Sequence, residues 1–133
     1  MSKLVVIIQC DTVTKRCSGY RCMDSFYGRK GAFADYGEDT QYMTMTCGGC
    51  CGVSVAAKLE NIRHRLVSYK QHYDEIVVHL ASCIVSDNYH RPPCPHKEYI
   101  QEIVERKGFK VVKGSYISKT ATKKRELKEY KEF

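Results

Sequence analysis

The sequence has no tryptophan, only three prolines and no long hydrophobic run. Its longest apolar run, Leu4–Ile8, is far shorter than the roughly 20 residues that cross a bilayer. This run is also too short for the core of a secretory signal peptide. We therefore expect a cytoplasmic protein with no membrane partner. Hydrophobic residues make up 43% of the 133 residues, which excludes an intrinsically disordered chain and suits one domain.

Cysteine is the abundant residue, with eight cysteines beside five histidines. Disulfides are rare in a reducing cytoplasm, where clustered cysteines more often bind metal or carry out redox chemistry. The composition therefore directs attention to a thiol site.

The net charge of +7 comes from 22 Lys and Arg against 15 Asp and Glu, and it is concentrated at one end. Residues 106–133 contain ten basic and three acidic residues, so the rest of the chain is balanced. A basic tail could contact the phosphates of a nucleic acid through Lys119, Lys123, Lys124 and Arg125. Glu126, Glu129 and Glu132 interrupt this run, which favours an ordinary solvated helix or tail. Nucleic acid is therefore not the expected partner.

Val- and Ile-rich segments alternate with segments of helical periodicity. Short strands are predicted at 3–9, 41–46, 75–80 and 110–113, with helices within 19–29, after Gly52, and from Pro95 to Gly108. Strands that alternate with helices indicate a parallel sheet with right-handed crossovers. We predict a small three-layer α/β fold at residues 1–116, with a four-stranded, mostly parallel sheet in Rossmann-like or flavodoxin-like order. Residues 117–133 would form a basic C-terminal tail or helix.

Three cysteines follow the ends of predicted strands. Cys10, Cys47 and Cys83 come directly or almost directly after the first three strands. The carboxyl ends of parallel strands meet at one edge, where open α/β sheets bind ligands. We therefore expect these three residues to lie close together. Cys17 and Cys22, in the first connection, and Cys94, before a helix, could reach the same edge.

The segment Cys47-Gly48-Gly49-Cys50 has the C-x-x-C spacing that lets two sulfurs bind one metal or form one disulfide. Its glycines permit a tight backbone with N–H groups aimed at sulfur. Cys51 is better explained as a small buried residue. Among the histidines, His96 at the start of a helix is the best candidate ligand. His79 could simply pack or meet solvent.

An ordered set of features makes the chain resemble the CGGC-domain family, named for its Cys-Gly-Gly-Cys and described as metal-binding proteins. The features run over roughly residues 3–116: Cys10, Cys17, Cys22, Gly31-Ala32-Phe33 before Tyr36, Thr46–Cys50, His79-Leu80, Ser82-Cys83 and Cys94-Pro95.

This resemblance implies a cysteine-rich metal site, commonly suggested to hold zinc, and no settled reaction. The cysteines that carry over are Cys10, Cys17, Cys22, Cys47, Cys50, Cys83 and Cys94. Two positions depart from the family. Cys51 replaces the usual proline after the central motif, and Gly114-Ser115-Tyr116 replaces Gly-Thr-His, so a histidine ligand is missing there.

Two cofactors fit such a site. Zinc needs four Cys or His ligands, whereas an iron–sulfur cluster typically takes four cysteines. Because seven cysteines exceed what one zinc ion needs, the sequence slightly favours a [4Fe-4S] cluster over Zn²⁺. The principal expected ligands are Cys10, Cys47, Cys50, Cys83 and Cys94. The role would be redox chemistry with a partner protein, sensing or metal handling. The alternative is a thiol-disulfide oxidoreductase that uses Cys47 and Cys50.

Overall fold

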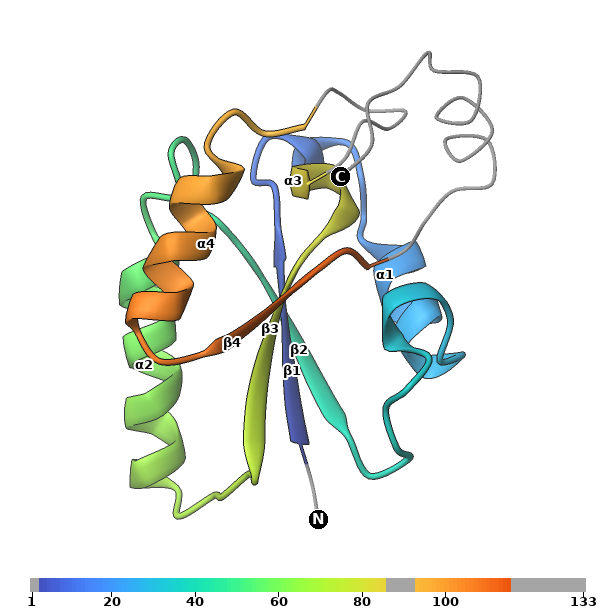
Figure 1. Cartoon of the computed structure of the whole chain (residues 1–133), viewed down its shortest axis with the longest axis vertical. Helices are drawn as coiled ribbons and strands as arrows, with labels where there is room; N and C mark the ends of the chain where they lie inside the picture. Colours follow the sequence, from blue (N-terminus) through green and yellow to red (C-terminus); the bar gives the residue numbers. More distant parts are fainter. Residues whose placement is uncertain (1–2, 86–92, 116–133) are drawn as a thin grey trace.

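The computed structural model describes residues 3–85 and 93–115 (Figure 1). Its strands are β1 (Lys3–Gln9), β2 (Gln41–Thr46), β3 (Glu75–Leu80) and β4 (Lys110–Lys113). Its helices are α1 (Tyr20–Tyr27), α2 (Val55–Ser68), α3 (Ser82–Val85) and α4 (Lys97–Arg106), with short 3₁₀ turns η1 (Val13–Lys15) and η2 (Gly31–Phe33). The predicted alternation of strands and helices is confirmed, and all four strands have the predicted bounds.

The sheet has the strand order β2-β1-β3-β4, and every neighbouring pair is parallel. In the central strand β1, Val6 pairs with Met43 on one side and with Val78 on the other. This order matches the first four strands of the flavodoxin-like arrangement, one of the two orders predicted. From β1 the chain adds β2 on one side of the sheet and then adds β3 and β4 on the other side. The topological switch point therefore lies between β1 and β3. Ligands of open α/β sheets bind outside the carboxyl ends of the strands at such a point.

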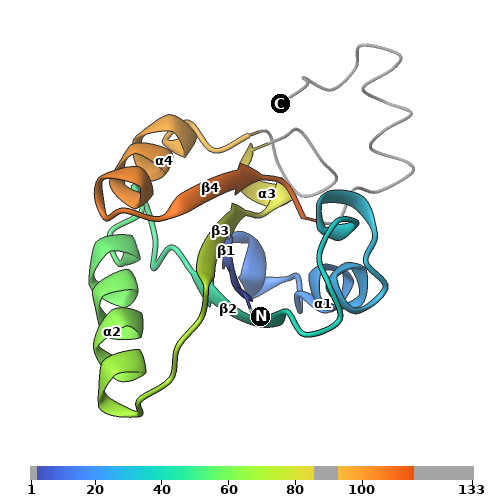
Figure 2. The same cartoon turned by 60° about the horizontal axis from the view of Figure 1, so that its bottom comes forward.

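Helices cover both faces of the sheet, which gives the predicted three layers. Figures 1 and 2 show α2 and α4 together on one face and α1 on the other. Alternate residues of β1 supply the two cores. Leu4, Val6 and Ile8 pack with the α2 and α4 side, and Val5 and Ile7 pack with Phe26 and Phe33.

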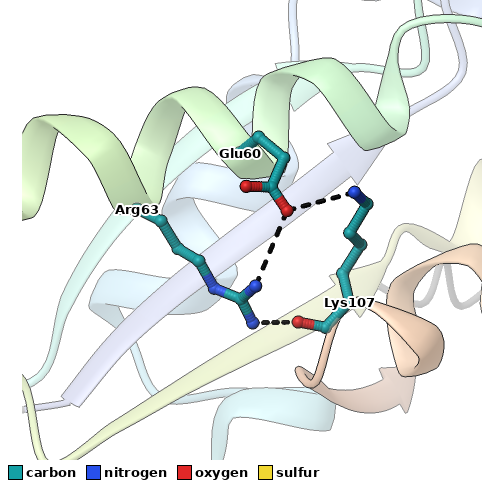
Figure 3. Close-up of polar contacts among 3 residues, drawn as sticks. All are labelled: Glu60, Arg63 and Lys107. Atoms are coloured by element: carbon teal, nitrogen blue, oxygen red, sulfur yellow. Dashed lines mark hydrogen bonds and ion pairs between the residues drawn. The ribbon is translucent and has the colours of Figure 1, made fainter.

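Helix α2 is fastened to the end of α4 by polar contacts (Figure 3). Glu60 Oε1 lies 3.1 Å from Lys107 Nζ and 3.6 Å from Arg63 Nη1. Arg63 also donates to the Lys107 carbonyl and stacks over the Phe109 ring at 4.4 Å. These contacts join the solvent-facing surface of α2 to the C-terminal end of α4.

Two local predictions are wrong. Helix α4 begins at Lys97 and has His96 as its N-cap, so Pro95 lies in a preceding turn rather than at the first helical position. The short helix α3 after β3 was not predicted, because four residues are too few to show a period. His90, Tyr116 and the basic tail at 117–133 fall outside the described residues. No helix within 3–85 or 93–115 has the length and apolarity to cross a membrane.

Candidate functional site

The cysteines at the ends of β1, β2 and β3 meet at the carboxyl edge of the sheet. The Cys10 amide donates to Cys83 Sγ at 3.4 Å, and the next amide, that of Asp11, donates to Cys47 Sγ at 3.5 Å. Cys10 and Cys47 are 5% and 6% exposed, and Cys83 is partly buried. The structure therefore brings together the three positions that topology predicted to converge, at the switch point of the sheet.

Cys83 is held as a neutral thiol. Burial, opposed by the hydrogen bond from the Cys10 amide, raises the pKa of Cys83 to about 12. The neighbouring thiols of Cys22, Cys10 and Cys17 raise this pKa further, because a second negative charge nearby is unfavourable. Cys17 and Cys22 from the first connection therefore lie in the electrostatic neighbourhood of Cys83, as the sequence suggested for that connection.

Cys22 makes a polar contact with the segment that follows β4, the outermost strand on that side of the sheet. Its Sγ lies 3.3 Å from Ser115 Oγ, just after β4. The Ser82 amide donates to Ser115 Oγ at 3.1 Å, and the Ser115 amide donates back to Ser82 Oγ at 3.0 Å. This reciprocal pair holds the end of β4 against the start of α3, directly beside Cys83. No sequence motif pointed to the pair, because its two serines are 33 positions apart.

The remaining cysteines differ in exposure. Cys94 is buried; its amide donates to the Ile84 carbonyl at 2.7 Å and its Sγ accepts from the His96 amide at 3.4 Å. His96 itself is half-buried. Cys50 and Cys51 are both exposed. The expectation that Cys51 is a small buried residue is therefore wrong, because the loop turns outward at that position.

The loop that carries Cys47 depends on glycine and on a polar anchor. Gly48 has φ +78°, and a Cβ there would lie 2.0 Å from Ser54 Oγ. The Gly48 amide donates to Thr46 Oγ1 at 3.3 Å, and this hydroxyl donates to Asp11 Oδ1 at 2.9 Å. Lys58 Nζ reaches from α2 to the Thr46 carbonyl at 2.9 Å. Lys58, Thr46 and Asp11 thus position the loop, and the sequence alone did not mark them.

His79 is a buried polar residue whose bonding partners the sequence did not indicate. The side chain is completely buried and lies on the α1 side of β3. Its ring bonds to Tyr36 and to the Gly114 carbonyl. His64 and His72 are exposed.

The cysteine sulfurs at this edge are of the chemical type that binds soft metals, but their arrangement does not form a closed coordination shell. Thiols are ligands of zinc and of iron–sulfur clusters. Within residues 3–85 and 93–115, however, no group of three or more His, Cys, Asp or Glu is arranged to hold a metal ion. The cysteines that gather at this edge are present as thiols.

The geometry differs from that of a thioredoxin-like redox site. In that type of site the C-x-x-C pair stands next to a helix N-terminus. Here α2 begins only at Val55, and the residues between Cys50 and Val55 form turns. The first cysteine of the motif, Cys47, is buried, and the second, Cys50, is exposed.

The model of the CGGC domain family matches residues 4–116, which is most of the chain. Neither the curated proteins nor the solved structures contain a match. The matched range contains all eight cysteines and every residue of the sheet except Lys3. The chain therefore belongs to the CGGC domain family.

Proposed function

We propose that this protein binds a thiophilic metal ion or cluster through cysteines at the carboxyl edge of its sheet. The observation that carries the proposal is the pair of consecutive amides at the end of β1, which donate to the sulfurs of Cys83 and Cys47. Hydrogen bonds to sulfur tune metal–thiolate centres. Family membership and the eight cysteines support the same class of function.

The principal ligand candidates are Cys10, Cys47 and Cys83, which meet at the switch point, together with Cys50 and Cys94. Cys17, Cys22 and His96 are further candidates. Because the described residues do not hold three donors in place, binding would draw the thiols together and displace their protons. A bound zinc ion would supply a closed structural centre, whereas a [4Fe-4S] cluster would supply electron transfer to a partner protein or redox sensing. The number of cysteines keeps the slight preference for the cluster.

Anaerobic purification followed by elemental analysis and visible absorption tests the proposal. Brown protein with iron and sulfide selects the cluster, and colourless protein with bound zinc selects the closed site. Cys83→Ser should lower the metal content, whereas the matched variant Cys51→Ser should leave it intact. Metal-free protein that takes up neither zinc nor a reconstituted cluster would refute metal binding.

Thiol-disulfide exchange is the second candidate, and the exposure of Cys50 favours it. An accessible thiol can attack a disulfide, with Cys47 three residues earlier available to resolve the mixed disulfide. Metal-free protein that contains a reducible bond between Cys47 and Cys50 would select this function. Nucleic-acid binding would rest on the tail outside the described residues, and a lack of RNA or DNA binding at low salt would dismiss it.

A further inference from the structure

Cys50 and Cys51 occupy the outer corner of a tight turn. The Gly52 amide donates to the Gly49 carbonyl at 2.8 Å, so the two cysteines are the central residues of a hydrogen-bonded four-residue turn. The base of the loop is fixed by a bond from the Ser54 amide to the Cys47 carbonyl at 3.0 Å. Gly52 is buried against α4, where a Cβ would lie 2.7 Å from Ile100 Cγ1. The adjacent thiols therefore stand on an anchored turn.

Cys50 and Cys51 differ from the strand-end cysteines in their exposure to solvent. Cys50 and Cys51 are exposed, whereas Cys47 at the base of the same loop is 6% exposed and its sulfur accepts from the Asp11 amide. Val53, two residues after the pair, is 70% exposed, and its Cγ1 would lie 3.9 Å from a Cβ built at Gly49. An apolar side chain thus lies on the outer surface of the same turn.

We propose that Cys50 and Cys51 form a second thiol site that binds a trivalent arsenical through both sulfurs. An arsenoxide, R–As=O, reacts with two thiols to give R–As(S)₂ and one water. Two S–H bonds and the As=O bond break, two As–S bonds form, and the two thiol protons leave with the oxygen. Arsenic stays trivalent, so the step needs no oxidant or reductant. Neighbouring thiols on one turn satisfy this two-sulfur requirement, and exposed Val53 suits an organic substituent.

Titration of the reduced full chain with phenylarsine oxide tests the site. Intact-mass spectrometry should show one phenylarsenic adduct. Alkylation with iodoacetamide and peptide mapping should then find Cys50 and Cys51 protected. The other cysteines should be alkylated to the same extent as in protein without the arsenical. Cys50→Ser and Cys51→Ser should each weaken binding by roughly 100-fold, since losing one of two linked contacts removes the chelate advantage. Both positions are exposed, and circular dichroism checks that each variant folds.

Cys22→Ser and Cys47→Ser are the matched controls and should retain the adduct. Protection of Cys47 with Cys50 in the wild-type chain, with Cys51 still alkylated, would overturn the assignment. This mapping needs no variant, so it decides the matter even if Cys47→Ser fails to fold. Absence of any adduct on the wild-type chain would also overturn it. Metal binding at the strand ends is tested separately, by elemental analysis.

Discussion

The hydroxyl of Tyr36 lies 2.6 Å from Nε2 of His79, a side chain with no exposed surface. His79 Nδ1 lies 2.9 Å from the Gly114 carbonyl oxygen, which can only accept a hydrogen bond. Nδ1 therefore carries the proton, and Nε2 accepts from Tyr36. One neutral ring thus joins the loop after η2, strand β3 and the end of β4. Burial lowers the pKa of His79 and, with the charges of Glu75 and Asp35, raises that of Tyr36 to about 12.

Tyr36→Phe should destabilise the protein by about 1–3 kcal/mol, because it leaves His79 Nε2 buried without a donor. Equilibrium unfolding in urea measures the loss. Tyr73→Phe is the matched control, since the Tyr73 hydroxyl bonds to Gln41 at an exposed site. The control should change stability by less than about 0.5 kcal/mol. Equal losses of stability in the two variants would show that the buried bond to His79 adds no more to the free energy of unfolding than the exposed bond of Tyr73.

His79 should make the protein less stable in acid. The pKa of His79 is lowered in the folded protein, whereas an unfolded histidine has a pKa of about 6.5. As the pH falls below about 6.5 the unfolded chain takes up a proton that the folded chain does not, so the free energy of unfolding decreases. Above that pH the contribution is complete. Unfolding midpoints from pH 5 to pH 8 should show this slope.

His79→Gln should flatten the pH dependence, because glutamine does not titrate. His72→Gln, at an exposed position, should keep the slope of the wild-type protein. A slope that persists unchanged in His79→Gln would assign the acid sensitivity to other groups.

The layers and strands could be predicted because their signals are local. The Val- and Ile-rich run of β1 is buried on both faces, and the stripe of Val55, Leu59 and Ile62 is the buried face of α2. Topology then sufficed to predict that Cys10, Cys47 and Cys83 converge, because all strands of a parallel sheet end at one edge.

Other features could not be predicted, because they depend on contacts between distant residues. The pair of Ser82 and Ser115 and the bond from Lys58 to Thr46 have no sequence period. The exposure of Cys51 follows from the turn between Gly49 and Gly52 rather than from its hydrophobicity. The ligand roles of the cysteines remain predictions.

Gly48→Ala should destabilise the loop more than Gly49→Ala. Both glycines have positive φ, at +78° and +119°, so alanine costs on the order of 1–2 kcal/mol at either position. A Cβ at Gly48 would also lie 2.0 Å from Ser54 Oγ, whereas the nearest atom to one at Gly49 is 3.9 Å away. Thermal and urea unfolding of the two variants compare the costs. Equal destabilisation would mean that the contact with Ser54 is relieved without penalty.

Lys58→Met should loosen the loop around Cys47. The Lys58 ammonium donates to the Thr46 carbonyl at 2.9 Å, one residue before the buried thiol. Loss of this charged donor should cost about 1 kcal/mol at a half-buried site and increase the rate of Cys47 alkylation relative to that of Cys10. Lys3→Met is the control, because Lys3 pairs with Glu75 at the exposed, opposite end of the sheet. Unchanged labelling of Cys47 in Lys58→Met would show that the loop is held by other contacts.

Cys83 should be alkylated more slowly than the exposed thiols. The thiolate is the reactive form, and burial raises the pKa of Cys83 to about 12, so its thiolate is scarce from pH 7 to pH 10. Quantitative peptide mapping after timed exposure to iodoacetamide should find Cys50 and Cys51 labelled first and Cys83 slowly. The Cys83 rate should rise about tenfold per pH unit without reaching a plateau below pH 10. Cys50→Ser is the matched control at an exposed thiol and should leave the Cys83 rate unchanged. A plateau near neutral pH would mean that Cys83 is an activated thiolate, and that the amide of Cys10 outweighs burial.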